Sequence, residues 1–444
     1  MKETAPYIET FERFEAQAKQ PAWVFPLRKA GLAQFAEMGF PTLQQEDWRF
    51  TSVEPIAKLP FRPVWEDLRD GLDTEAVAGF TFGKLAASRL VFVNGHYAAE
   101  LSDPGALPRG VVVSSLAAAL AENEGLTQKH LAHYAQGEDN PFVALNAAFF
   151  QDGGFVYVPA GVHLEAPVHL LFISTVKEPG ATSHPRNLII AERASQVTVF
   201  EGYASVVEAP YFTNAVTELV VGEGATVEHG KFQDESRSAF HMAAVQAQLG
   251  RGCNFISHSI AAGARLSRNN IRTALAGEGV ECVLNGLYLT RGDQLADHHM
   301  VVEHAQPHCN SHEYYNGILD GRSKGVFHGR ILVRPAAQKT DAKQTNKNLL
   351  LSDDATVDTK PQLEIYADDV KCTHGATVGQ LNEEAVYYLR TRGLSAETAR
   401  RMLIHAFAGE IIERVRHAPA REELDKLVWD RLERHPRVGE RKSV

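Results

Sequence analysis

The sequence predicts a mainly β protein whose core is a parallel β-helix (solenoid), flanked by N- and C-terminal α-helical regions. A short turn motif recurs at a near-constant spacing, short strands surround each copy, and helical periodicity dominates only towards the two ends of the 444-residue chain. A single repeat of this kind cannot bury its own apolar face, so successive units have to stack on one another. A β-sandwich is the alternative, but the recurring turns lack the Asn-Gly pairs of hairpins.

Residues 1–85 form the first predicted region, which is helical with irregular links. Over Phe11–Lys19 and Leu27–Met38, apolar residues recur at spacings of three and four between charged and amide side chains, as in amphipathic helices. Gly39 and Pro41 end the second helix, because a proline disfavours the helical conformation in the residue before it.

The second predicted region is the β-helix core, residues 86–380. It begins with a β-branched run at Arg89–Val93 that a turn signal closes. A helical excursion near residues 116–152 interrupts it, with helices expected over 117–122, 128–134 and 143–150. Asn140 followed by Pro141 gives the clearest helix start, since asparagine caps a helix and proline fits its first turn.

The turn motif occurs in four aligned copies inside this core. The fourth residues of the copies follow one another after 30, 28 and 27 residues; they are Ala194, Gly224, Gly252 and Gly279. Apolar residues alternate with other side chains on both sides of each copy, as in β-strands. Leu351–Val357 resembles the same unit further along the chain. A tight turn between two strands at a near-constant period is typical of a stacked solenoid.

Residues 381–444 form the third predicted region, which is helical again. Ser395 is expected to cap a helix that has Glu397 in its first turn. The apolar stripe of this helix follows helical spacing and consists of Ala399, Met402, Leu403, Ala406, Phe407, Ile411 and Val415. A second helix is predicted over Glu422–Leu432, and Arg434–Val444 is predicted to be a solvated basic tail.

Composition limits the classes of function. The 45 Lys and Arg residues against 55 Asp and Glu give a formal net charge of −10, so the chain lacks the basic balance that nucleic-acid binding requires. No apolar run approaches the ~18 residues of a membrane-spanning helix, and the acids in Met1–Glu12 argue against a signal peptide. We expect a cytoplasmic protein with reduced thiols, because no Cys-x-x-Cys pair occurs among its four cysteines, which are Cys253, Cys282, Cys309 and Cys372.

Motifs of common enzyme classes are absent: there is no nucleotide-binding glycine loop, no Gly-x-Ser-x-Gly elbow and no His-Glu-x-x-His. Histidine is abundant, with 19 copies, and Asp297–Glu313 holds five of them together with one cysteine and three acids. These residue types bind zinc and iron. However, the spacing is loose and Pro307 interrupts it, so the stretch matches no metal template. The alternative is a set of solvated histidines in the turns of stacked coils.

Cys372 and His374 are a sharper candidate for a metal or cluster site. In a strand, side chains alternate, so these two residues share one face with backbones ~7 Å apart. Two ligands do not complete a tetrahedral site, and iron–sulfur clusters usually take about four thiolate-type ligands. Further ligands therefore have to come from a partner chain or from other coils. The alternative is a buried cysteine beside a hydrogen-bonded histidine in a β core.

Several segments together resemble the signature of the SufB/SufD family of iron–sulfur cluster assembly proteins. They are Phe327–Ile331, Thr345–Leu351, Thr359–Gly379 and Tyr388–Gly393. Near the start, Gly39–Thr51 is similar to the N-terminal signature of the SufD branch. SufB members typically carry cysteine-rich motifs in their N-terminal half, whereas this chain has no cysteine before Cys253. The resemblance covers most of the chain and indicates the SufD branch.

The resemblance implies a right-handed parallel β-helix and a non-catalytic scaffold in a cytosolic complex of one SufB, two SufC ABC ATPases and one SufD. In such a complex the C-terminal helical region docks SufC, and the β-helix pairs with that of SufB. His374 matches a family histidine thought to help hold the nascent iron–sulfur cluster at this interface, where Cys372 also lies. The cluster is transient and shared with the partner, so we expect the isolated chain to bind none tightly.

In isolation, the chain is expected to form a homodimer through open β-helix edges. Two other functions fit the same residues: a β-helix enzyme acting on polysaccharides through the acids of Asp297–Glu313, often with calcium, or a homo-oligomeric structural protein. Activity on acidic polysaccharides would identify the first. The native mass with and without SufB and SufC would identify the second.

Overall fold

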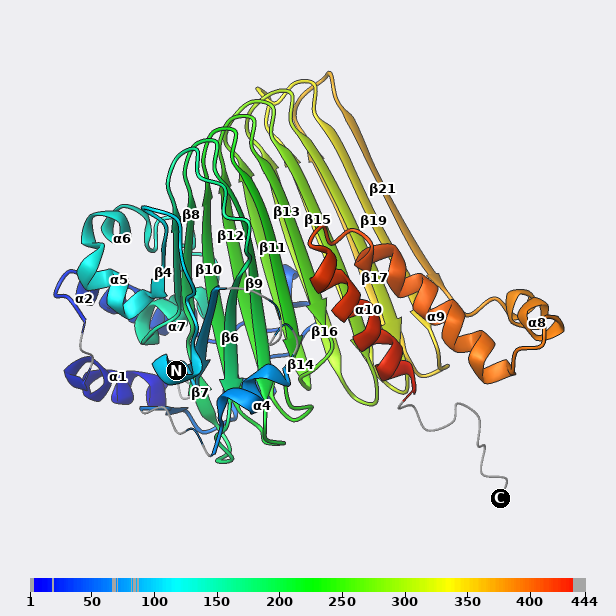
Figure 1. Ribbon diagram of the computed structural model, residues 1–444, viewed down its shortest axis with the longest axis horizontal. Coiled ribbons are helices and arrows are strands. Elements are labelled where there is room, and N and C mark those ends of the chain that lie inside the picture. The colour runs from blue at the N-terminus through cyan, green and yellow to red at the C-terminus, as the bar shows by residue number, and fades with distance from the viewer. Residues whose placement is uncertain are drawn as a thin grey trace.

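In the computed structural model, a parallel β-solenoid of about eight turns forms the core, and helices lie at both ends of the chain (Figure 1). The structure describes residues 4–17, 20–65, 69, 71–80, 82, 85 and 88–433. The mainly β class, the parallel solenoid and the helical ends are confirmed as the sequence predicted. No helix within the described ranges is both long and apolar enough to span a membrane.

Two sheets form the walls of the solenoid. Sheet A has the order β20-β18-β16-β14-β12-β10-β8-β5-β4, with β7 pairing β10 and β1 at its side, and sheet B has the order β21-β19-β17-β15-β13-β11-β9-β6-β2-β3. The strands of sheet A are β1 (Arg62–Pro63), β4 (Val112–Ser115), β5 (Gly154–Val158), β7 (Ala181–Ser183), β8 (Arg186–Ala191), β10 (Phe212–Val221), β12 (Phe240–Leu249), β14 (Leu266–Leu275), β16 (Leu295–His304), β18 (Lys324–Val333) and β20 (Thr356–Ile365). Those of sheet B are β2 (Ser88–Val93), β3 (His96–Tyr97), β6 (Val168–Ser174), β9 (Gln196–Ser205), β11 (Thr226–Asp234), β13 (Asn254–Ala261), β15 (Glu281–Thr290), β17 (Asn310–Leu319), β19 (Asp341–Leu350) and β21 (Lys371–Gly379). Neighbouring strands pair in parallel except β2 with β3 and β4 with β5.

The repeated turn joins each sheet A strand to the next sheet B strand. Its fourth residue adopts the left-handed conformation in every predicted copy, with φ of 55° at Ala194 and 61° at Gly252. This residue donates its backbone N–H to the turn of the following coil, as Gly252 does to the Glu278 carbonyl at 2.8 Å. The series continues at His308 and Lys339, which also have positive φ.

Leu351–Val357 belongs to a different set of turns. It joins β19 of sheet B to β20 of sheet A, at the opposite end of the strands. The prediction that it repeats the same unit is therefore wrong. A solenoid coil contains two turns, and both connect short strands through small and polar residues, so the sequence pattern alone did not separate them.

Alternate residues of the strands point into the solenoid, where one apolar cluster runs along its length from Leu90 to Phe327. Polar side chains are buried there too and are hydrogen-bonded. Glu201 accepts hydrogen bonds of 2.7 Å from Thr217 and from Tyr203, and its Oε1 lies 2.9 Å from His229 Nε2. The interior thus combines apolar packing with buried polar groups, of which Glu201 is one that is fully hydrogen-bonded.

Most of the N-terminal helices cover the outer face of sheet A near β8 to β14, whereas the short helix Thr74–Ala78 packs its Val77 with Val91 and Leu171 of sheet B. Three of them supply most of the aromatic cluster there, packed on Phe212, Phe240 and Leu266. The helices before the first long coil are α1 (Ala5–Gln17), α2 (Val24–Met38), α3 (Glu54–Ala57), α4 (Thr74–Ala78), α5 (Leu116–Glu122), α6 (Glu124–His130) and α7 (Pro141–Phe149), with 3-10 turns η1 (Glu46–Trp48) and η2 (Ala99–Leu101). Lys19, the predicted end of the first helix, lies outside the described residues. The first two helices begin earlier than predicted: α1 begins at Ala5 rather than Phe11, and α2 begins at Val24 rather than Leu27.

The helix predicted over residues 128–134 is present but begins and ends four residues earlier, as α6 (Glu124–His130). Ala132 adopts φ of 62°, and the buried Glu218 carboxylate accepts the backbone N–H groups of Ala132, Tyr134 and Ala135. A carboxylate 84 residues away from Tyr134 therefore takes the donors that a helix would use. Long-range competition of this kind leaves no local sequence signal.

Residues 39–53, which we call the N-terminal strap, lie across the outer face of sheet A. The Arg268 guanidinium of β14 stacks on Trp48 with its carbon 3.7 Å from the ring centroid. Thr51 Oγ1 donates a hydrogen bond of 2.5 Å to Asp297 Oδ2 of β16, and Lys324 Nζ of β18 donates one of 3.1 Å to the Phe50 carbonyl. The strap is thus attached to three successive sheet A strands.

The C-terminal helices α8 (Glu383–Thr391), α9 (Ala396–Ile412) and α10 (Ala418–Glu433) follow the last strand, and α9 and α10 lie on the outer face of sheet B (Figure 1). Ser395 caps α9 as predicted, accepting the Thr398 N–H at 3.0 Å. The predicted apolar stripe is partly wrong, because Met402 and Ala406 are exposed. The residues that pack on sheet B are Ile404, Ala408, Ile411, Ile412 and Val415. The predicted tail Arg434–Val444 lies outside the described residues.

Candidate functional site at the open end of the solenoid

The final coil, β20 and β21, ends both sheets. Each strand pairs on one side with the preceding coil, and no described strand pairs with its other side. Most of β21 is exposed, and so are the large apolar side chains of Ile365, Tyr366 and Val378. An uncovered edge of this length offers unpaired backbone groups to another chain. In the described structure, the final coil thus leaves one edge of each sheet uncovered.

Cys372 and His374 lie on the inner face of this coil. In the parallel register they are opposite Ala342 and Gln344, two fully buried residues of β19, whereas Lys343 between them is exposed. The alternation predicted from the sequence therefore places both side chains on one face. Among the described residues, no further His, Cys, Asp or Glu completes a three-ligand group with them. Any complete metal or cluster site here needs ligands from another chain.

The two side chains differ in their surroundings. Cys372 packs against an apolar cluster that includes Ile331 and Leu363, and it is half-buried. Burial raises the pKa of its thiol, and the nearby Asp341 carboxylate raises it further. His374 is exposed. The thiol is thus held in its protonated form at neutral pH, while the imidazole faces the open end.

Beneath His374, two polar side chains continue along the inner face. Gln344 is its register partner, and Gln344 in turn is paired with Glu313 of β17. Gln344 Nε2 donates a hydrogen bond of 2.5 Å to Glu313 Oε2, and the Oε1 atom of each has no partner among the described residues. Burial raises the pKa of Glu313 to about 8, although the hydrogen bond from Gln344 lowers it. A carboxyl group that is protonated near neutral pH therefore lies two strands below His374.

The histidine-rich stretch Asp297–Glu313 is not one site. Strand alternation sends His298 and His304 into the solenoid and leaves His299 on the outer face of sheet A. His308 occupies a turn, and His312 points out from sheet B. The expectation of solvated turn histidines is also wrong for four of the five, since they lie in strands rather than turns; His298, His299 and His304 are in β16 and His312 is in β17. Gln344, which lies next to His374 on the inner face, was not predicted as part of the site, because a single amide side chain in a strand matches no sequence motif.

A parallel β-solenoid with helical ends, an uncovered final coil and an incomplete ligand pair define the structural class of this protein, but a fold of this kind does not fix a function by itself. Sequence comparison identifies the family. Residues 172–407 match the SUF system FeS cluster assembly, SufBD core domain, and residues 1–170 match the SufBD protein N-terminal region. The chain therefore belongs to the SufBD family of iron–sulfur cluster assembly proteins, as its motifs indicated.

Curated relatives extend over nearly the whole chain. An iron–sulfur cluster assembly SufBD family protein of Synechocystis is 34% identical over 87% of this chain and 86% of the relative. The iron–sulfur cluster assembly protein SufD of Escherichia coli is 32% identical over 94% of this chain and 95% of its own length. SufD of Bacillus subtilis is 26% identical over 91% and 93%, respectively. The prediction of the SufD branch is confirmed by these similarities.

Proposed function

We propose that this chain is the non-catalytic scaffold subunit of a cytoplasmic SUF complex. It pairs through its final coil with a SufB-like chain and docks a SufC-like ABC ATPase on its C-terminal helices, so that a nascent iron–sulfur cluster is built where the two scaffolds meet. The observation that carries the proposal is the uncovered final coil, which presents two open strand edges and an inner face bearing Cys372 and His374.

The donor set supports a shared rather than a resident cluster. An imidazole and a thiol on one face supply two of the roughly four ligands that such clusters take. The Cys372 thiol, whose pKa is raised by burial, has to lose its proton before it binds iron. Positive charge from incoming iron favours that step. A chain with this donor set depends on the partner for the remaining ligands and holds no cluster tightly alone.

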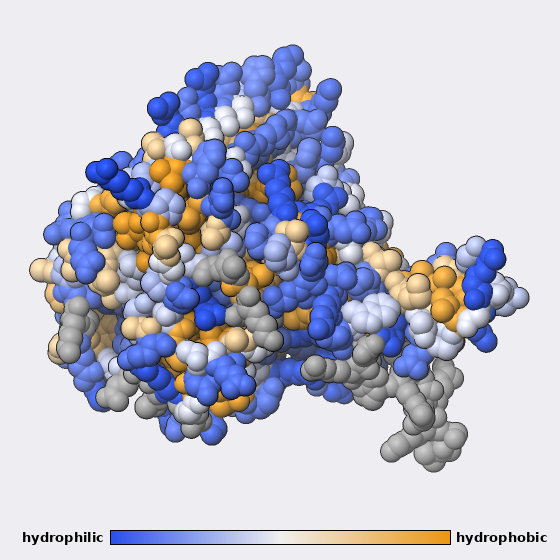
Figure 2. Space-filling view, in the orientation of Figure 1, coloured by the Kyte–Doolittle hydropathy of each residue, from blue (hydrophilic) through white to orange (hydrophobic). Residues whose placement is uncertain are grey.

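The surface of the C-terminal helices supports ATPase docking. Tyr387 and Tyr388 of α8 are 68% and 57% exposed, and Met402 of the following helix, α9, is exposed as well. Helix α8 projects away from the solenoid, and Figure 2 shows apolar side chains gathered on this projection. Arg400 Nη2 of α9 lies 2.7 Å from Glu383 Oε1 of α8, an ion pair that joins the two helices. Exposed aromatic residues on a small protrusion are typical of protein interfaces.

The pairing is tested by removing one edge donor from β21. Lys371 N–H donates to the Thr340 carbonyl, so the alternation of a parallel ladder directs the Ala376 N–H to the free edge. A proline is tolerated in an edge strand at such a position. We expect Ala376→Pro to retain the β-rich circular dichroism spectrum and to weaken binding to a co-expressed SufB-like chain at least tenfold.

The matched control is Ala376→Val, which keeps the N–H group and should bind like the parent chain. The same pair of variants tests self-association: the isolated parent should be a dimer by native mass spectrometry, and Ala376→Pro a monomer. Undiminished binding of the SufB-like chain by folded Ala376→Pro would contradict pairing through this edge.

A further inference from the structure

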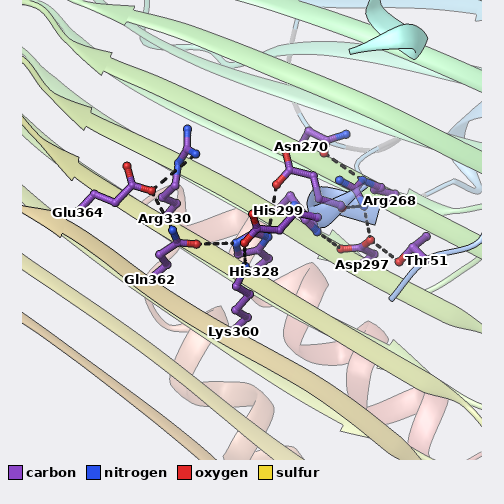
Figure 3. A network of polar contacts seen from close by, with 12 residues as sticks. Thr51, Arg268, Asn270, Asp297, His299, His328, Arg330, Lys360, Gln362 and Glu364 are labelled. Carbon is purple, nitrogen blue, oxygen red and sulfur yellow. Dashed lines mark hydrogen bonds and ion pairs between the residues drawn. The ribbon is translucent and has the colours of Figure 1, made fainter. Parts of the chain in front are cut away.

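Two histidines and an aspartate meet on the outer face of sheet A, away from the final coil's inner face. His299 of β16 and His328 of β18 are register partners, and their ring centroids are 4.6 Å apart (Figure 3). Asp47 belongs to the N-terminal strap, which lies across this face of the sheet, and its Oδ1 is 3.9 Å from His328 Nδ1. One ligand atom from each of the three residues lies within 4.8 Å of the other two. Three donors from distant parts of the chain thus converge.

Each imidazole has an oxygen atom close to its other nitrogen. His299 Nε2 lies 3.3 Å from Asp297 Oδ1, and His328 Nε2 lies 3.4 Å from Gln362 Oε1 (Figure 3). When these nitrogens carry the protons, Nδ1 of each ring has a free lone pair. Metal-binding histidines in proteins almost always donate their second N–H to a carboxylate or carbonyl oxygen in this way. The two rings are therefore oriented as ligands are.

The Asp297 carboxylate is itself fixed. Arg268 Nη1 donates a hydrogen bond of 2.8 Å to Asp297 Oδ2, which also accepts the hydroxyl of Thr51. Its Oδ1 is buried and has no hydrogen-bond partner among the described residues. A slight rotation of the His299 ring, whose Nε2 is 3.3 Å away, would satisfy this oxygen. Arg268 and Thr51 thus hold the Asp297 carboxylate in place, and its Oδ1 atom is available to accept a hydrogen bond from His299.

The cations near Asp47 form their ion pairs with other carboxylates. Each of them is paired with a carboxylate of its own: Arg268 with Asp297, Lys360 with Glu46, and Arg330 with Glu364. The ion pair of Asp47 among the described residues is with His328. Among the described residues, the Asp47 carboxylate is therefore not held in an ion pair with any of these three cations.

The group borders a cleft of about 500 Å³ between the strap, the segment from Tyr134 to Asn140 and the outer face of sheet A. This space admits water or a small ligand to further coordination positions. Arg268 also donates a hydrogen bond of 2.8 Å to the Asp47 carbonyl, which fixes the backbone while the carboxylate stays 68% exposed. The carboxylate can therefore turn toward the rings without moving the strap.

We propose that Asp47, His299 and His328 form a mononuclear site for a divalent first-row transition-metal ion. Two imidazoles and one carboxylate with open positions are a common donor set for such ions. Ligand atoms about 2.1 Å from one tetrahedral ion lie about 3.4 Å apart, so the three groups have to approach by at most roughly 1.4 Å. The bound ion would tie the strap to sheet A. The site shares no residue with the Cys372–His374 face and does not depend on the function proposed for it.

The test uses the full chain with Cys372→Ser and His374→Ala as background, so that the other candidate ligands are removed. After treatment with EDTA and its removal, Co2+ is titrated by calorimetry and visible absorption. We expect one Co2+ per chain, with d–d absorption and no thiolate charge-transfer band, and a rise in the melting temperature. Asp47→Asn and His328→Ala should each weaken binding at least tenfold and abolish that rise.

The matched control is Asp139→Asn, because Asp139 lines the same cleft but pairs with Arg272 instead. It should bind Co2+ like the background protein, and Mg2+, which prefers oxygen ligands, should not compete. Asp47→Asn is the decisive variant, since an exposed side chain leaves folding intact. The proposal is overturned by absence of Co2+ binding in the background protein, by undiminished binding in Asp47→Asn, or by equal loss in Asp139→Asn.

Discussion

Glu313, buried two strands below His374, gives a prediction about stability and pH. We expect Glu313→Gln to stabilise the protein at neutral pH. Burial raises the pKa of Glu313 to about 8 in the folded chain, against 4.5 for the free side chain, despite the hydrogen bond from Gln344. Between these two values the folded state holds a proton that the unfolded state releases. Folding at pH 7 therefore requires uptake of a proton.

The sign and size of the effect follow from this proton. Where the folded state binds one proton more, the free energy of unfolding falls by about 1.4 kcal/mol for each pH unit of increase. From 4.5 to pH 7 the accumulated loss is about 3 kcal/mol. Glutamine accepts the hydrogen bond of Gln344 through its carbonyl oxygen and needs no proton. Glu313→Gln should therefore gain up to about 3 kcal/mol at pH 7 and only about 0.8 kcal/mol at pH 5.

The measurement is the free energy of unfolding by denaturant at several pH values, compared between the parent and Glu313→Gln. Taking the difference removes the contributions of other titrating groups. Glu201→Gln is the control, and its effect on stability should have the opposite sign. Burial alone would raise the pKa of Glu201, but hydrogen bonds from His229, Thr217 and Tyr203 outweigh burial and lower that pKa. This variant should be destabilised at pH 7. A difference for Glu313→Gln that does not change between pH 5 and 8 would refute the reasoning.

At the open end, His374→Ala should change the free energy of unfolding by less than about 0.5 kcal/mol, because the side chain is exposed. The same variant should sharply lower the amount of iron and acid-labile sulfide per purified complex. Cys372→Ala should lower them less, since the partner can supply thiolates; normal cluster content in His374→Ala, with stoichiometry checked by native mass spectrometry, would remove this ligand. On α8, replacing both Tyr387 and Tyr388 by alanine should weaken ATPase binding at least tenfold, whereas Tyr366→Ala, an equally exposed tyrosine on the final coil, should not. Equal binding by all these variants would place the ATPase elsewhere.

The sequence allowed the solenoid and its period to be predicted because the turn imposes a local requirement. A residue with positive φ is needed at every copy, and glycine meets that need without strain at Gly224, Gly252 and Gly279. His308 and Lys339 occupy the same position without being glycine, so the later copies gave no signal. Caps such as Ser395 were predictable for the same reason, since the side chain bonds its own helix.

Features fixed by distant residues were not predictable. The end of α6 depends on Glu218, and the ligand group on the outer face of sheet A combines the strap with two strands more than 250 residues further on. The histidine-rich stretch was noticed by composition, but only the strand register separates His299, which joins that group, from the buried His298. The shared face of Cys372 and His374 needed no such register, because alternation along one strand fixes it.

The two ends of the solenoid are finished differently, and the difference bears on function. At the N-terminal end, the antiparallel strands β3 and β4 terminate the two sheets, and Tyr97 and Leu107 pack on the apolar cluster inside. Stacked repeats generally need such terminal caps to shield the core from water. The C-terminal end has apolar helices available, but α9 and α10 lie on the outer face of sheet B and leave Val378 of the final coil exposed. Because α9 and α10 lie on the side of the solenoid rather than across its end, the final coil keeps the uncovered edges that the proposed pairing requires.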